Sequence, residues 1–112
     1  MYTNATYKST NMAGKYIKHE IENASQPELV LKIFDFAITS CKKGDMEKTN
    51  NAIGVLISAL RFDREDLKKI SVDLLRLYQF VQDKMREGDT DISLTILQTL
   101  KNTFKEVFDK NK

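Results

Sequence analysis

The stretch NASQPELVLKIFDFAI, residues 23–38, combines a helix start with an unusually apolar helix. Ser25 and Glu28, three residues apart, have the spacing of a capping box. Pro27 fits the first turn, where its missing N–H costs no hydrogen bond. At 100° per residue the apolar side chains that follow cover an arc of roughly 220°. Such a helix needs several neighbours to cover it, so the stretch predicts a helical bundle.

The composition agrees with one helical domain. The chain has 112 residues, of which 41% are hydrophobic, and one Pro and four Gly leave little room for turns. No apolar run is long enough to cross a bilayer, and the polar N-terminus lacks the apolar core of a signal peptide. Cys41 is the single cysteine and has no internal partner for a disulfide. We therefore expect a cytoplasmic protein without membrane insertion.

Stop and cap signals divide the chain into a polar, flexible N-terminal arm over residues 1–24 and a helical domain over residues 25–112. A short helix near residues 15–22 fits within the arm. Gly44 and Gly88 end helices, and Asp45, Asp63 and Asp91 are candidate N-caps. The predicted helices cover about residues 26–43, 46–62, 64–87 and 92–109. Short connections make neighbours antiparallel, so we predict an all-α, up-down-up-down four-helix bundle.

The boundary between the second and third helices is the least marked. No Gly or Pro lies between Ala59 and Val72, and a heptad spacing of apolar residues continues across it. A single helix over residues 46–87 would be roughly 60 Å long. A domain of this size has a radius of gyration near 13 Å. We therefore predict a break around residues 63–65.

Residues that carry chemistry are scarce. His19 is the only histidine and lies in the arm, which argues against di-iron, zinc-protease and phosphotransfer sites. Cys41 lies on the apolar arc, as a core residue would. The paired lysines have carboxylates nearby and the net charge is +2, so no basic face for nucleic acid is expected. We expect no enzymatic activity, no metal site and no cofactor.

The first two helices have more apolar surface than a bundle helix needs. In one interpretation two neighbours and the arm cover the excess. In the other, part of it is an open groove for an amphipathic helix of a partner. We also expect the arm, with its tyrosines and isoleucines, to compete for such a groove.

The segment YIKHEIENASQPELVLKIFDFAI, residues 16–38, resembles the signature of the flagellar secretion chaperone family FliS. The matching positions include Tyr16, Ile21, the Glu-Leu-Val-Leu run from Glu28 and the Phe-Asp pair at Phe34. LLRLYQFV, residues 74–81, resembles the family's third helix, and GDMEKTNNAI, residues 44–53, the start of its second. Phe104 stands where many members have Trp. The chain departs from the family pattern at three positions: Pro27 lies one residue later, Phe34 replaces Tyr and Phe36 replaces a common Gly.

The resemblance implies an antiparallel four-helix bundle that binds the disordered C-terminal segment of flagellin. Such a protein keeps flagellin unpolymerised in the bacterial cytosol and delivers it to the flagellar type III export gate. We expect a monomer; the alternative is a bundle that self-associates through the same faces and has no flagellin client. The candidate client contacts are Tyr7, Tyr16, Ile21, Ile53, Leu56, Leu60, Leu75 and Tyr78.

Overall fold

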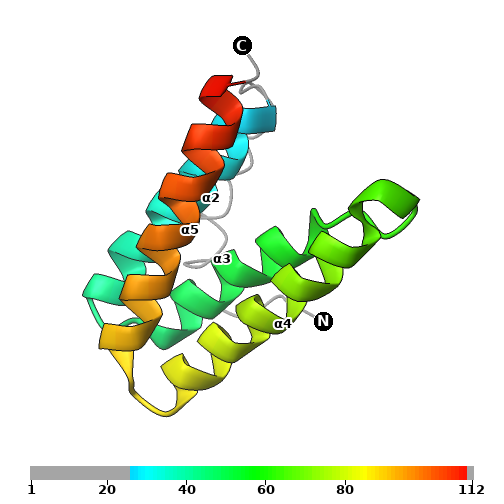
Figure 1. Ribbon diagram of the computed structural model, residues 1–112. Helices are drawn as coiled ribbons and strands as arrows, with labels where there is room; N and C mark the ends of the chain where they lie inside the picture. The colour runs from blue at the N-terminus through cyan, green and yellow to red at the C-terminus, as the bar shows by residue number, and fades with distance from the viewer. Residues whose placement is uncertain (1–25, 111–112) are drawn as a thin grey trace, which may run out of the picture.

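The computed structural model describes residues 26–110 and contains four α-helices in this range, without strands. They are α2 (Gln26–Lys42), α3 (Met46–Ser58), α4 (Glu65–Arg86) and α5 (Thr90–Lys110). Consecutive helices run antiparallel (Figure 1). The predicted fold class, an all-α four-helix bundle, is confirmed. None of the four described helices is long and apolar enough to cross a membrane.

The helices form two pairs that diverge like the limbs of a V (Figure 1). One pair is α2 with α5, the other α3 with α4, and α2 also packs on α3 as α4 does on α5. We call the end where the pairs meet the vertex; it contains the connections at residues 43–45 and 87–89. The radius of gyration is 14.5 Å, above the roughly 13 Å of a compact 100-residue domain. The helix pairs therefore meet at the vertex and diverge toward the other end (Figure 1).

Glycines make both turns at the vertex. Gly44 has a φ of 71° and Gly88 a φ of 82°, a left-handed conformation that favours glycine. The residue after each glycine forms a backbone hydrogen bond to the preceding helix. The N–H of Asp45 donates to the Ser40 carbonyl, and the N–H of Asp89 donates to the Lys84 carbonyl, both at 2.9 Å. These bonds satisfy carbonyls at the helix ends. The helix stops predicted from the two glycines are confirmed.

The N-caps in the structure match only some of those predicted from the sequence. Asp45 caps α3 as predicted, since its Oδ1 accepts a hydrogen bond from the N–H of Lys48 at 3.1 Å. Asp91 was predicted to cap the last helix, and this is wrong. That helix begins two residues earlier than predicted, at Thr90, and Asp89 Oδ1 accepts a hydrogen bond from the N–H of Ile92 at 3.3 Å. The Ser25 cap lies outside the described residues.

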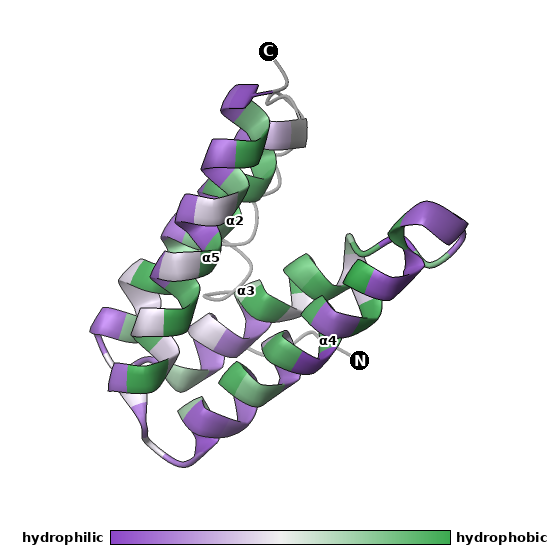
Figure 2. Cartoon of the chain, viewed as in Figure 1, coloured by the Kyte–Doolittle hydropathy of each residue, from purple (hydrophilic) through white to green (hydrophobic). Residues whose placement is uncertain are grey.

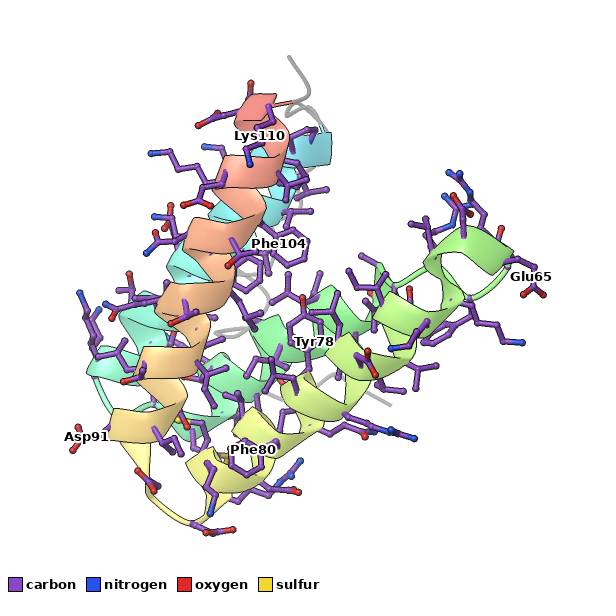
Figure 3. The ribbon with its side chains drawn as sticks, viewed as in Figure 1. Glu65, Tyr78, Phe80, Asp91, Phe104 and Lys110 are labelled. Atoms are coloured by element: carbon purple, nitrogen blue, oxygen red, sulfur yellow. The ribbon has the colours of Figure 1, made fainter. Side chains whose placement is uncertain are left out.

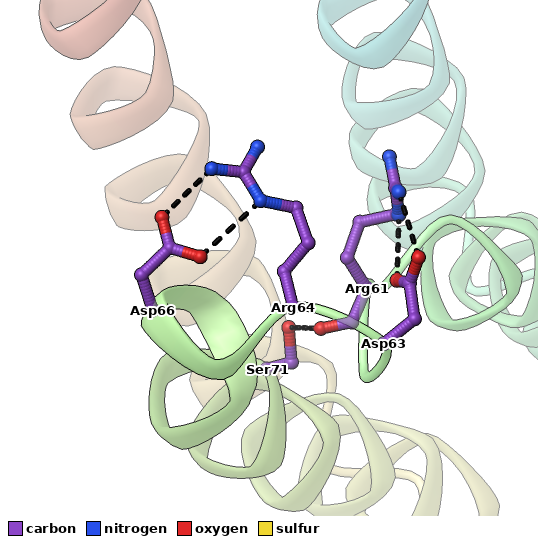
Figure 4. A network of polar contacts seen from close by, with 5 residues as sticks. All are labelled: Arg61, Asp63, Arg64, Asp66 and Ser71. Atoms are coloured by element: carbon purple, nitrogen blue, oxygen red, sulfur yellow. Dashed lines mark hydrogen bonds and ion pairs between the residues drawn. The ribbon is translucent and has the colours of Figure 1, made fainter.

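The break between α3 and α4 exists, but α3 ends earlier than predicted, at Ser58. Figure 4 shows why Asp63 is not a cap: its carboxylate pairs with the Arg61 guanidinium, at 2.9 and 3.0 Å. Arg64 precedes α4 and makes no capping bond with its side chain. Instead, the Ser71 hydroxyl donates to the Arg61 carbonyl at 2.7 Å. This bond ties the connection back onto α4.

The hydrophobic core lies mainly at the vertex, where all four helices contribute. Phe34 of α2 is fully buried and contacts two rings from other helices. The ring centroids lie 5.3 Å from Phe104 of α5 and 6.5 Å from Tyr78 of α4. The buried apolar residues are Ile33, Phe34, Ala37, Ile38, Cys41, Ala52, Ile53, Leu56, Tyr78, Val81, Met85 and Leu97.

A reciprocal polar contact fixes α3 against α4. The Asn50 side-chain amide donates to the Gln82 carbonyl, and the Gln82 amide donates to the Asn50 carbonyl, both at 3.1 Å. Sliding one helix by a turn, about 5.4 Å, would break both bonds. The contact therefore sets the register of the α3/α4 pair.

Candidate functional site

The most distinctive surface is made of two apolar rows that begin in the core and run out along the open end of the V. The first row, which we call the α5 stripe, consists of Leu97, Leu100, Phe104 and Val107 at helical spacing. Its burial falls along the row. Leu97 is fully buried, Leu100 and Phe104 are half-buried, and Val107 is 48% exposed.

The second row, the α4 stripe, consists of Val81, Leu77, Leu74 and Ile70. It shows the same gradient away from the vertex. Val81 is fully buried, Leu77 and Leu74 are half-buried, and Ile70 is 56% exposed, the most exposed of the large apolar residues that the structure describes. Figure 2 shows hydrophobic residues continuing along α4 and α5 beyond the vertex.

Hydrogen bonds and ion pairs show which way each stripe faces. Lys101 of α5 forms an ion pair with Asp35 of α2. Leu100 and Val107 lie roughly 100–120° around the helix from Lys101, so they are turned away from α2. Likewise Gln82 faces α3, and Ile70 lies roughly 120° around α4 from it.

The outer residues of each stripe therefore lie to one side of the contact between the two helices of its own pair. In Figure 3, Phe104 and Tyr78 lie on the sides of α5 and α4 that are turned toward the opposite pair. Near the vertex the two stripes share one core, whose cluster contains both Leu97 and Val81. Farther out the pairs diverge, and Ile70 is 56% and Val107 48% exposed.

The predicted client contacts fall into three groups: buried residues, half-buried residues and residues outside the described range. Ile53, Leu56 and Tyr78 are core residues, at 0%, 3% and 2% exposure, so in this conformation they hold the bundle together and are not accessible to a client. Leu60, in the connection after α3, and Leu75, on α4, are half-buried, and their client contact stays a prediction. The other predicted contacts, Tyr7, Tyr16 and Ile21, lie outside the described residues.

The sequence did indicate the two stripes, because their spacing marks the apolar faces of the third and fourth helices. It gave no sign that their outer ends are exposed. A core face and a binding face use the same residue types at the same spacing. Only the angle between the helix pairs distinguishes them here.

Two arginines in the α3/α4 connection pair with nearby aspartates. Arg64 binds Asp66 through two contacts at 2.8 and 3.2 Å, next to the Arg61–Asp63 pair (Figure 4). The hydrogen bond from Arg61 lowers the pKa of Asp63. These pairs are exposed and contribute little to stability.

The described residues contain no group of three or more His, Cys, Asp or Glu side chains that could hold a metal ion. Cys41 is 1% exposed, and its thiol lies 3.7 Å from Met85 Sδ and 3.5 Å from the Thr90 carbonyl. Burial raises the pKa of this thiol, and the Asp91 carboxylate raises it further. The prediction that Cys41 is a core residue is confirmed, because Cys41 belongs to the buried hydrophobic cluster.

Comparisons of the chain with protein-family models, with curated proteins and with solved structures find no match.

Proposed function

We infer that this protein is a flagellar export chaperone. It binds the disordered C-terminal segment of flagellin in the bacterial cytosol, prevents premature polymerisation and delivers flagellin to the flagellar type III export gate. The sequence resemblance over residues 16–38 supplies the client. The single structural observation that supports a binding role is the exposure of the outer ends of both stripes.

A client segment gains its binding energy by folding against this surface. An amphipathic helix presents apolar residues at i, i+3, i+4 and i+7, the spacing of the α4 and α5 stripes themselves. Burial contributes about 25 cal/mol for each Å² of apolar surface. Part of that gain is offset by the entropy lost when a disordered chain becomes ordered. The outcome is reversible binding, as a protein that must hand over its client requires.

The test is calorimetric titration with a peptide of the flagellin C-terminal segment. Ile70→Glu places a charge on the most exposed position of the α4 stripe, where the folded chain tolerates it. We expect it to weaken peptide binding by at least about tenfold, which corresponds to about 1.4 kcal/mol.

Val55→Glu is the matched control. Val55 is 39% exposed and lies roughly 200° around α3 from the buried Ile53, on the opposite side of that helix. It should bind the peptide as the parent protein does. Absence of binding to the parent protein contradicts the proposed function. Equal loss in both variants contradicts the placement of the client on the stripe.

A further inference from the structure

We propose that the connection between α3 and α4 is a hinge through which two copies of the chain exchange their halves. In the exchanged dimer, α3 and α4 of each copy form one continuous helix. Helices α2 and α3 of one copy then pack on α4 and α5 of the other. The hinge consists of residues 59–64. This goes beyond the proposed function and does not depend on it.

The first observation is that the sequence favours a helix where the structure has a break. No Gly or Pro lies between Gly54 and Gly88. The hinge contains alanine, leucine and two arginines, which are among the best helix formers. A seven-residue spacing of apolar side chains also continues through the hinge; its members are Ile53, Leu60, Leu67, Leu74 and Val81. The break is therefore not imposed by a residue that excludes the helix.

The second observation concerns the backbone of the hinge. Ala59, directly after α3, is already in the helical region, with φ −87° and ψ −5°. Arg64, directly before α4, is extended, with φ −110° and ψ 125°. Within the described chain, no backbone N–H of residues 61–66 donates to a backbone carbonyl. In a continuous helix each would donate to the carbonyl four residues earlier. Straightening the hinge therefore forms backbone hydrogen bonds that the closed chain lacks.

Few side-chain contacts oppose this straightening. The Ser71 hydroxyl donates to the Arg61 carbonyl at 2.7 Å (Figure 4). In a continuous helix these two residues would lie about 15 Å apart along the axis, so this bond belongs to the closed chain. The two arginine–aspartate pairs of the hinge are exposed and contribute little to stability.

A straightened chain needs a second copy because it cannot make its own contacts. A helix over residues 46–87 is roughly 60 Å long and holds α3 away from α4. The reciprocal Asn50–Gln82 bonds and the Lys101–Asp35 ion pair then have no partner in the same chain. A second straightened copy supplies every one of these partners, whereas α2 on α3 and α4 on α5 stay within each chain. Exchange of identical elements is a low-cost route to dimers for this reason.

The first experiment is the mass of the full chain in solution without flagellin, by size-exclusion chromatography with light scattering. We expect the single-chain mass of 12.9 kDa in dilute solution. A species of twice that mass should appear as the concentration rises, and it should revert slowly on dilution because the halves must separate. A single-chain mass at all concentrations up to the millimolar range overturns the proposal.

Glu65→Pro distinguishes the hinge from any other route to a dimer. Glu65 is the first residue of α4, where proline fits, and Arg64 already has the extended backbone that a residue before proline prefers. The closed chain therefore accepts the substitution. A continuous helix does not, because proline in its interior removes a hydrogen bond and clashes with the preceding turn. We expect the share of dimer to fall by at least about tenfold. Glu65→Ala is the matched control and should leave it unchanged; a dimer that survives Glu65→Pro overturns the proposal.

Ser71→Ala tests the opposite direction. It removes the hydroxyl that ties the hinge to α4 in the closed chain, so the share of dimer at a fixed concentration should rise several-fold. Ser58→Ala is the control, since the Ser58 hydroxyl donates to the Val55 carbonyl of its own helix at 2.7 Å. Circular dichroism shows whether these variants are folded. A folded Ser71→Ala protein with the dimer share of Ser58→Ala contradicts the proposed hinge.

A final experiment asks whether the dimer is an exchanged one. Carbodiimide joins lysines directly to carboxylates that they contact, and Lys101 of α5 pairs with Asp35 of α2. In the exchanged dimer these residues come from different copies, so treatment of the isolated dimer should give covalently linked chains on a denaturing gel. Lys101→Arg keeps the positive charge without the reactive amine and should abolish this product. Two closed chains in contact would give single chains only, and that result overturns the exchange.

Discussion

Replacing Phe34 by Ala tests the way in which three helices meet in the core. The ring is fully buried and contacts Tyr78 of α4 and Phe104 of α5. Truncating a buried Phe costs about 3–5 kcal/mol, and each aromatic pair contributes about 0.5–1.5 kcal/mol of its own. We expect a loss near the upper end, about 4–5 kcal/mol. A domain of this size is stabilised by only about 5–15 kcal/mol, so the variant should be close to unfolding.

The assay is urea denaturation followed by far-UV circular dichroism. Phe36→Ala is the control, since Phe36 lies on the same helix but is only half-buried, and we expect it to cost less than half as much. A double-mutant cycle of Phe34→Ala with Phe104→Ala isolates the contact between α2 and α5. Its coupling should be about 0.5–1.5 kcal/mol. Equal losses for Phe34 and Phe36, or additive effects in the cycle, would refute this account of the core.

Four further outcomes are expected. Gly54→Ala should stabilise the protein by about 0.5–1 kcal/mol, because Gly54 is inside α3 and an added Cβ meets no atom within 4 Å. Gly88→Ala should destabilise it by about 1–2 kcal/mol, because φ is 82° there; thermal melts measure both changes. Asp45→Ala should cost about 1 kcal/mol through loss of the α3 cap, and an unchanged urea midpoint would exclude that cap. Burial raises the pKa of Tyr78 from 10.0 to about 12. The folded state then holds the phenolic proton more tightly, so stability is complete below pH 10 and is lost as the pH rises toward about 12. Tyr78→Phe should lack this part of the alkaline loss in denaturation measured across that range.

The sequence predicts the helices well where glycine ends them and less well elsewhere. Gly44 and Gly88 require a left-handed backbone, which few other residues adopt, so the turns at the vertex were found correctly. No such residue marks the break between α3 and α4. There the apolar spacing continues, and the chain leaves the helix at Ser58 to form side-chain contacts around Arg61. Sequence periodicity contains no information on these contacts.

The candidate site was harder to predict for a different physical reason. Amphipathic patterns identify which side of a helix is apolar, but the angle between two helix pairs depends on packing at the vertex. Leu56 lies on the same broad apolar arc as Leu60. The first is in the core, whereas the second is half-buried and lies beyond the end of α3 at Ser58. Position along the V, which the sequence does not specify, decides which apolar residues a partner can reach.

The pairing of α2 with α5 has a consequence for the order in which the protein can be made. Among the described helices, the ribosome synthesises α2 first and α5 last. The Lys101–Asp35 ion pair therefore joins the first of these helices to the last. The α3/α4 hairpin, with its reciprocal Asn50–Gln82 bonds, is contiguous and can form while synthesis continues. Helix α2 can pack on α5 only after α5 has left the exit tunnel of the ribosome. During elongation α2, which with α3 is the more apolar of the described helices, is therefore the one with the longest delay before both its neighbours are present.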